Sequence, residues 1–264
     1  MNKLALTLVG MAFAVLPAAA QDFDSDFSFG SWDDFNKVEI SSNDKHVETS
    51  IKFAFPMYFG TSVLTDLTYN DTWGILEKVY PDFMDLNARK NFVYGLELVS
   101  MHVRTGAVDL SLGLRWTFMN FTFRDPACTI RPVRETGDFI STMLLQDNQC
   151  VPYGIRMETP GYDGTKSKLF ASYLGIPFRV SLNYGKATVY GGVSAELLMD
   201  SYTKYKHPKV REPINGLFND FRASVEAGIS LYNFGLFVNY GLTPLFKDQY
   251  SNAHTLTVGV TLGI

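Results

Sequence analysis

The chain has 264 residues, enough for one barrel or one large β domain, and its formal net charge is only −4 at pH 7. So slight a charge indicates no nucleic-acid partner. The class of protein must therefore come from the pattern of residues along the chain.

Residues 1–20 have the pattern of a secretory signal. Lys3 precedes an apolar run from Leu4 to Leu16, and Ala18 to Ala20 supply an A-x-A cleavage motif. The run is too short to cross a bilayer, which takes about 20 apolar residues. Because no cysteine near this motif could carry a lipid anchor, we predict cleavage after Ala20.

Residues 21–45 mix aspartates with aromatic residues. Such a segment can dock onto a partner, but a solvated flexible tail is the more common meaning of this composition. We predict an acidic periplasmic linker here, followed by a folded domain over 46–264.

The stretch from Val108 to Phe118 alternates strictly, with every even position apolar and every odd position small, polar or charged. This period of two predicts a strand with one apolar face. Similar alternation predicts eight strands, over 47–59, 92–102, 108–118, 169–184, 187–199, 221–232, 236–246 and 254–264. Pro56 in the first strand predicts a bulge near the rim that carries the long loops.

The connections alternate between short turns, near residues 105, 185 and 234, and longer segments over 60–91, 124–168, 200–219 and 247–253. An even number of strands, with short turns at one rim and long loops at the other, is what an outer-membrane barrel requires. We therefore predict an all-β fold, a transmembrane antiparallel up-and-down barrel of eight strands in the bacterial outer membrane. A further hairpin around 139–145 would raise the count to ten.

The face opposite the apolar one carries charges of both signs, which fits a narrow, salt-bridged lumen and not the inside of a lipocalin-like barrel. These charges are Glu48, Lys52, Glu97, Asp109, Arg115, Arg179, Glu196, Arg222 and Glu226. Counting back from the turn at Gly185 places Arg179 opposite Gly192, and counting from the centre of the loop between residues 200 and 218 places Glu226 opposite Gly192 as well. We predict that Arg179 reaches past Gly192 to Glu226 and that neighbouring pairs close the lumen. Those pairs are Glu196 with Arg222 and Glu97 with Arg115.

Aromatic residues gather near the strand ends and predict two interfacial belts. The belt at the long-loop end would comprise Phe59, Phe92, Tyr94, Trp116, Phe118, Phe170 and Phe246, and the belt at the short-turn end Tyr184 and Tyr232.

Two features of the long loops also give predictions. Apolar residues from Trp73 to Leu86 have near-helical spacing, which predicts a short helix ended by Pro81 and packed over the barrel mouth. Cys128 and Cys150 both lie in the second long loop. In an exported protein such a pair predicts a disulfide, with two unlinked thiols as the alternative.

The sequence offers little for catalysis. Its histidines, at 46, 102, 207 and 254, match no metal-binding spacing. A lipid-modifying barrel enzyme needs a histidine with a serine and a carboxylate, and His254 near Ser251 is the one loose candidate. A rim histidine is the simpler interpretation. We predict no catalytic residues, no metal and no cofactor.

The motif Tyr-Leu-Gly-Ile-Pro-Phe over 173–178, followed by Arg-Val-Ser-Leu-Asn-Tyr and the turn at Gly185, resembles the PorT-like outer-membrane β-barrel family of Bacteroidetes. That family commonly has a Leu-Glu-Ile-Pro-Leu strand before a tyrosine and a glycine-containing turn. The chain departs from it at Gly175, where glutamate is frequent, and at Ile264, where many bacterial barrels end in an aromatic residue. The resemblance implies the barrel and its outer-membrane location, but not the secretion role of some members.

Three functional classes remain: a closed structural or surface-interaction barrel, a narrow transporter, channel or secretion-associated barrel, and a lipid-modifying barrel enzyme. An eight-stranded barrel is filled by its own side chains, which favours the first class. The expected partners are outer-membrane lipid and an extracellular or envelope protein that contacts the long loops.

Overall fold

The computed structural model describes residues 37–40, 48–52, 56–79, 82–133, 149–155, 161, 163–206 and 209–263. The predicted signal peptide and the hairpin around 139–145 lie outside these residues. Within the predicted linker, residues 37–40 are described, and they form a strand that pairs with β2. The strands are β1 (Lys37–Ile40), β2 (Glu48–Lys52), β3 (Met57–Thr65), β4 (Phe92–Thr105), β5 (Val108–Thr122), β6 (Cys128–Pro132), β7 (Cys150–Gly154), β8 (Ser167–Tyr184), β9 (Ala187–Tyr205), β10 (Val210–Pro213), β11 (Phe221–Leu231), β12 (Phe234–Gly241) and β13 (His254–Leu262), with helices α2 (Asp71–Val79) and η2 (Ala88–Lys90).

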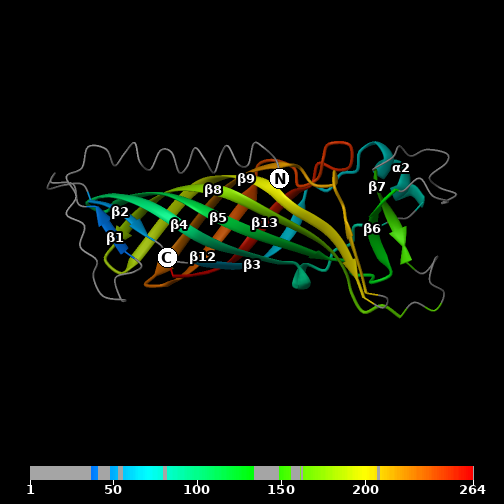
Figure 1. Ribbon diagram of the computed structural model, residues 1–264, viewed down its shortest axis with the longest axis horizontal. Helices are drawn as coiled ribbons and strands as arrows, with labels where there is room; N and C mark the ends of the chain where they lie inside the picture. Colours follow the sequence, from blue (N-terminus) through cyan, green and yellow to red (C-terminus); the bar gives the residue numbers. More distant parts are fainter. Residues whose placement is uncertain are drawn as a thin grey trace.

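Eight antiparallel strands close into a barrel (Figure 1). Their order is β4, β3, β13, β12, β11, β9, β8 and β5, and β5 pairs back with β4. The predicted eight-stranded barrel is confirmed. The β6–β7 hairpin forms a separate two-stranded sheet outside the wall. Because the barrel closes with eight strands, the ten-strand alternative is wrong.

The two ends of the barrel differ as predicted. At one end short turns join consecutive strands, and two of them place Gly106 and Gly185 at φ of 59° and 63°, where side chains are disfavoured. The opposite end carries α2, η2, β10 and the β6–β7 hairpin (Figure 1). Among the described residues, no helix is both long and apolar enough to cross a membrane.

The predicted first strand is in fact two strands, β2 and β3, which both pair with β4 on either side of Pro56. The break lies where β4 has a bulge after Glu97, and Pro56 O accepts a hydrogen bond from Glu97 N at 3.1 Å. Met57 pairs with Leu262 at the end of β13. The break is therefore toward the short turns, and the prediction of a bulge at the long-loop rim was wrong. Proline interrupts the ladder here because it has no N–H to donate.

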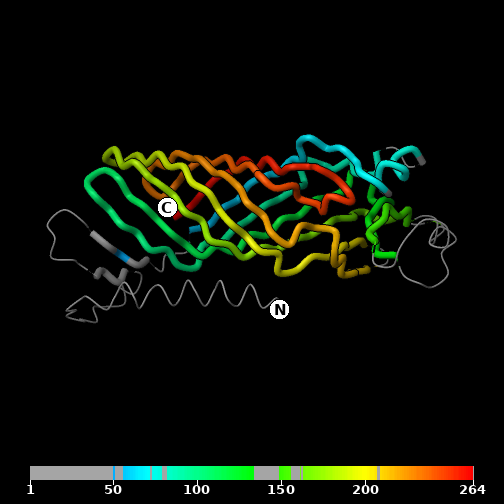
Figure 2. Tube along the Cα trace, turned by 90° about the horizontal axis from the view of Figure 1, so that it is seen from above, coloured from blue at the N-terminus to red at the C-terminus, as the bar shows by residue number. Residues whose placement is uncertain are grey.

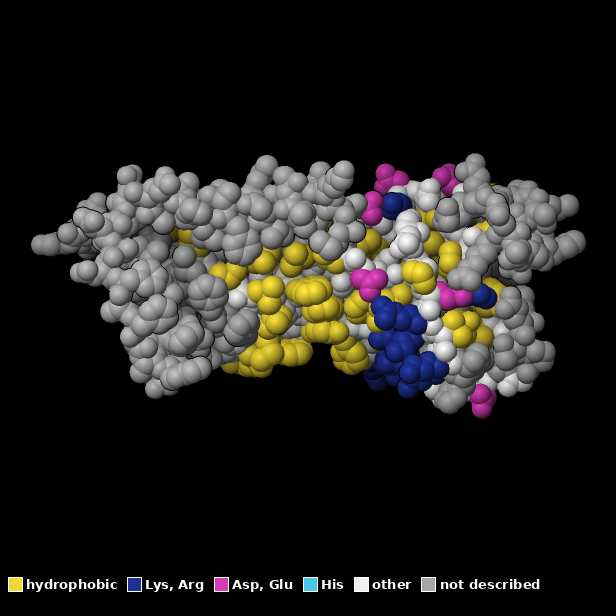
Figure 3. Space-filling view, viewed as in Figure 1, with side chains coloured by type: hydrophobic (Ala, Val, Ile, Leu, Met, Phe, Trp, Pro, Cys, Tyr) yellow, Lys and Arg dark blue, Asp and Glu magenta, His cyan; other side chains and the backbone are white. Residues whose placement is uncertain are grey.

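The strands alternate as the sequence predicts, with apolar side chains outside. Leu110 and Leu112 are each 39% exposed on the outer wall, whereas Ser111 between them is 5% exposed. Figure 3 shows apolar side chains gathered on the middle of the visible face of the barrel, and Figure 2 shows the strands running obliquely along it. The seventh predicted strand ends early, at Gly241.

Candidate functional site

The lumen contains two rows of charged residues, each interrupted by a glycine. In the first row Arg179 on β8 and Glu226 on β11 both pair with Gly192 on β9. This is the register predicted from the sequence. In the second row Arg115 and Glu196 lie on either side of Gly175, and Glu196 is opposite Arg222.

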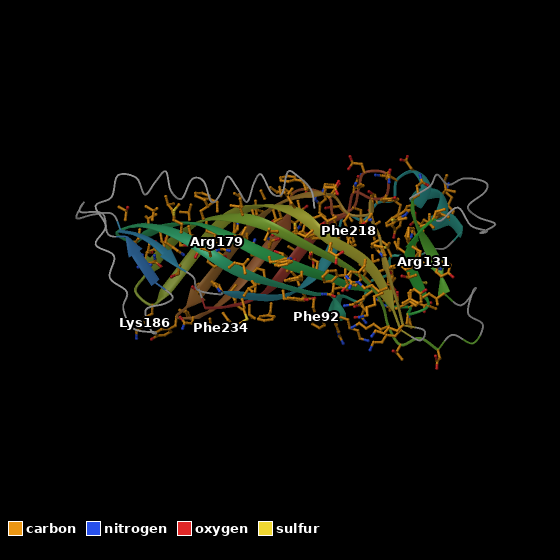
Figure 4. All side chains as sticks on the ribbon, in the orientation of Figure 1. Phe92, Arg131, Arg179, Lys186, Phe218 and Phe234 are labelled. Atoms are coloured by element: carbon orange, nitrogen blue, oxygen red, sulfur yellow. The ribbon has the colours of Figure 1, made fainter. Side chains whose placement is uncertain are left out.

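These five charged side chains and Glu97 of β4 form one chain of ion pairs of alternating charge. Arg179 is 2.7 Å from Glu97 and is also paired with Glu226. Arg115 NH1 is 2.7 Å from Glu226, and its NH2 is 3.8 Å from Glu196. The chain of alternating charges, named the lumen chain below, runs Glu97, Arg179, Glu226, Arg115, Glu196, Arg222. Three arginines therefore balance three glutamates. Figure 4 labels Arg179 within the barrel wall, between the two ends.

Glycines give these long side chains room to cross the neighbouring strand. A Cβ at Gly192 would lie 2.3 Å from the carbonyl oxygen of Phe178 and 3.0 Å from Arg179 Cγ. A Cβ at Gly175 would lie 2.3 Å from Glu196 Cγ. A side chain at either position would therefore displace a member of the lumen chain. At Gly175, where the PorT-like family often has glutamate, this barrel has no space for one.

Two of the three predicted pairs are present, and the third is wrong. Arg179 pairs with Glu226, and Arg222 pairs with Glu196. Glu97 and Arg115 are directly opposite in the β4–β5 register, but Glu97 binds Arg179 instead. The carboxylate of Glu97 lies over Gly113, where an added Cβ would be 2.7 Å from Glu97 Oε1. Because Gly113 has no side chain, the side chain of Glu97 can extend across β5 to Arg179 on β8.

Neutral side chains complete the polar contacts of the lumen chain. Tyr58 OH donates to Glu97 at 3.1 Å, and Thr117 Oγ1 donates to Glu196 at 3.0 Å. A cavity of about 30 Å³ lies among these groups, which is room for one or two water molecules. The Nε atoms of Arg115 and Arg222, whose side chains line it, have no protein acceptor among the described residues. Bound water is the natural acceptor for both.

An apolar cap fills the long-loop end of the lumen. Its buried members come from α2, the hairpin, the strand ends and the loops: Trp73, Phe83, Met84, Val93, Met119, Phe121, Phe123, Ile130, Cys150, Leu169, Ala171, Tyr173, Ile214, Leu217, Phe218, Leu245, Phe246, Tyr250 and Ala253. The predicted helix over this mouth is confirmed, and it ends before Pro81. Phe246 is fully buried here. Its assignment to the outer aromatic belt was wrong, because β12 ends five residues earlier and the chain turns inward.

The β6–β7 hairpin is anchored to the barrel by polar contacts. Arg131 makes a bidentate ion pair with Glu212, through Nε at 2.7 Å and NH2 at 3.0 Å. Thr129 Oγ1 and Thr203 Oγ1 are 2.6 Å apart. Trp73 Nε1 donates to the carbonyl oxygen of Cys150 at 2.8 Å. These contacts hold the hairpin against β9, β10 and α2.

No disulfide joins Cys128 and Cys150, so the predicted bridge is absent. The hairpin register pairs Cys128 with Gly154 and Cys150 with Pro132, which places the two cysteines at opposite ends of the hairpin. Four residue steps of about 3.4 Å separate those ends, whereas a disulfide needs Cα atoms within about 7 Å. Burial raises the pKa of the Cys150 thiol to about 12.

The outer wall carries an aromatic belt at the long-loop end. Tyr94, Phe118 and Trp116 are stacked, with ring centroids 4.8 and 5.3 Å apart. Phe170 continues the row and stacks on Tyr202 at 4.4 Å; sequence reasoning missed Tyr202. The predicted members Phe59 and Phe92 are also exposed. At the other end Tyr184 and Tyr232 are each 65% exposed.

One hydrogen-bonded group was missed because of the β4 bulge. Beyond the bulge even positions face inward, and His102 Nε2 lies 3.0 Å from Ser100 Oγ while its Nδ1 lies 3.1 Å from Asp109 Oδ1. Ser100 is 3% exposed, so a substrate has no access to its hydroxyl. Arg104 also binds Asp109, at 3.3 Å. The group therefore ties β4 to β5 near the short-turn end.

The candidate at the other rim does not assemble. His254 Nδ1 lies 2.9 Å from the carbonyl oxygen of Gly241, and its ring stacks on Tyr240. Ser251 is fully buried and its Oγ accepts a hydrogen bond from Ala253 N. Within the described part of the chain, no three His, Cys, Asp or Glu side chains are grouped to hold a metal ion.

No protein-family model matches the chain, and no curated protein matches it. Among solved structures, the chain is similar to the crystal structure of Neisserial surface protein A, with a TM-score of 0.36 and 8% identity over 81% of this chain and 99% of that chain. So remote a likeness carries no argument about function. The resemblance to PorT-like barrels stays a prediction.

Proposed function

We propose that this chain is a small outer-membrane barrel with a closed lumen and a structural or surface-interaction role. The polarity of the wall supports the location, because its apolar side chains face outward and the charged side chains of the lumen chain are buried inside. Residues 108–118 of β5 would rise about 25 Å if tilted by about 40°, which matches the apolar band of such barrels. The aromatic residues at both strand ends suit the two water interfaces.

The lumen chain is the observation that carries the closed-lumen proposal. Its six charges are all at most 7% exposed, and each has at least one partner of opposite charge. The cavity beside it holds about 30 Å³, and the apolar cap lies above. A conducting pore would need a continuous water-filled path, and the paired buried charges together with the apolar cap argue against one.

The surface role rests on the long-loop end. This end has its own apolar core and an anchored hairpin. It therefore presents a preformed surface on the outside of the cell, to which an extracellular or envelope protein can bind. A non-enzymatic role is part of the same proposal, because the two serine–histidine neighbourhoods lack an accessible hydroxyl.

Two measurements test the proposal. Cell fractionation should recover the protein from the outer membrane in detergent, as a band whose mobility on gels changes on heating. Planar bilayers that contain the purified protein should show no steady conductance steps, with a known porin at the same density as the positive control. Recovery as a soluble periplasmic monomer would disprove the location, and reproducible conductance would favour the transporter alternative.

A further inference from the structure

A row of cations crosses the long-loop ends of the strands on the outer wall. Lys168 on β8 is directly opposite Lys204 on β9, and Lys204 is opposite Arg211 on β10. Lys90 of η2 adjoins them, since its carbonyl oxygen accepts a hydrogen bond from Thr122, the residue paired with Lys168. Figure 3 shows lysine and arginine side chains gathered at this end of the apolar band. These four cations are named the basic row.

A bulge in β9 brings the basic row to the outside. The register between β8 and β9 shifts beside Ser172 and Tyr173. Before the bulge odd-numbered residues of β9 face outward, as the 51% exposure of Val193 shows. After it, Thr203 is fully buried and Lys204 faces outward. Without the bulge Lys204 would point into the barrel, so this irregularity places a second lysine beside Lys168.

The basic row lies just above the aromatic belt. Phe170 and Tyr202, which stack at 4.4 Å, are each two residues nearer the centre of the apolar band than Lys168 and Lys204. Two residues correspond to about 7 Å along a strand. Because interfacial aromatic rings lie at the level of lipid headgroups, the basic row lies where lipid phosphates are found.

The protein itself supplies little negative charge to the basic row. Lysines directly opposite each other destabilise a sheet, yet Lys168 Nζ donates only to a neutral group in the described contacts, Asn120 Oδ1 at 2.6 Å. Arg211 is 3.1 Å from Asp200 and lies over the ring of Tyr202 at 3.9 Å. Among the ion pairs of the described residues, Asp200 is therefore the carboxylate that contacts one of these four cations.

We propose that the basic row binds the phosphate group of an anionic lipid in the leaflet at the long-loop end. The inference rests on the proposed function, which places the apolar band in a membrane. A phosphate between Lys168 and Lys204 removes their repulsion, and the apolar and aromatic surface beneath it accommodates the acyl chains. That apolar surface favours a lipid over free phosphate as the source of the anion.

The test measures lipid binding to the full mature protein in neutral detergent by native mass spectrometry. Phosphatidic acid should bind more tightly than phosphatidylcholine, and Lys204→Gln should weaken its binding about fivefold, the loss expected for one lysine at an anionic surface. Lys204→Arg should keep the binding. The matched control is Lys186→Gln, which removes a lysine that also lies over an aromatic ring, Tyr232 at 5.1 Å, but at the short-turn end (Figure 4).

Three outcomes would overturn the inference: equal binding of the two lipids, equal weakening by K204Q and K186Q, or displacement of the lipid by millimolar inorganic phosphate. The bilayer and fractionation measurements are made on the same protein. A barrel that enters the outer membrane and stays closed but shows no preference for phosphatidic acid would refute the lipid site alone. A protein that fails to enter membranes would refute the proposed function.

Discussion

Arg179→Met breaks the lumen chain at an inner link. Arg179 is 7% exposed and binds both Glu97 and Glu226. After its removal Glu226 keeps Arg115 at 2.7 Å, but Glu97 keeps only the hydroxyl of Tyr58 at 3.1 Å among the contacts described. Breaking a buried ion pair costs about 3–5 kcal/mol. Because one of the two glutamates remains paired, we expect a loss of about 3 kcal/mol.

The structure also predicts which second substitution restores stability. Adding Glu97→Gln removes the end of the lumen chain and leaves Glu226, Arg115, Glu196 and Arg222 in alternation. The R179M/E97Q variant should lie within about 1 kcal/mol of the natural protein, because a buried ion pair replaced as a whole often costs little. R179M combined with Glu226→Gln should recover less, because Glu97 then still lacks an arginine.

The assay is urea unfolding of the protein folded into lipid vesicles, followed by its heat-modifiable gel band. A double-mutant cycle gives the coupling energy between Arg179 and Glu97. The matched control is Arg124 with Asp85, an ion pair of 3.2 Å whose side chains are 68% and 40% exposed; its coupling should be about 0–1 kcal/mol. A coupling in the lumen no larger than that of this surface pair would refute the lumen chain.

Three further predictions concern the glycines, the cysteines and the cap. Gly192→Ala should destabilise the barrel by about 1–3 kcal/mol through overpacking, whereas Gly191→Ala, whose Cβ would meet its nearest atom at 3.9 Å, should be tolerated; equal urea midpoints would contradict this. Cys150 should resist maleimide in the folded, unreduced protein even at pH 9, because burial raises its thiol pKa to about 12 and keeps it protonated. Unfolding without reductant should expose both Cys150 and Cys128 to labelling, and a failure of both to label would indicate a disulfide. Trp73→Ala should cost about 3–5 kcal/mol by emptying the centre of the cap, as measured by urea unfolding, and a loss below about 1 kcal/mol would show that the cap contributes little.

The barrel and part of its lumen could be predicted because the signals are local. Alternation with a period of two decides which side chains share a face, and short turns fix the register of the strands they join. Counting from the turn at Gly185 placed Arg179 opposite Gly192, and counting from the centre of the loop over 200–218 placed Glu226 opposite Gly192 as well. The same reasoning failed beyond the bulge in β4, at Ser100, because one extra residue moves every later side chain to the other face. The predicted fifth strand ended at residue 199, so it assigned no face to Lys204.

What the sequence by itself determined is therefore the closed barrel with an apolar outside and a charged inside, since these follow from residue type and strand position alone. Only the tertiary structure decided which carboxylate each arginine binds. Glu97 and Arg115 are opposite in register, yet Glu97 turns over Gly113 to Arg179 and leaves Arg115 to Glu226 and Glu196. The physical reason is that each charged side chain in a confined space of low dielectric constant interacts with several others at once. The pairing is therefore decided by all six side chains together and cannot be assigned from two strands alone.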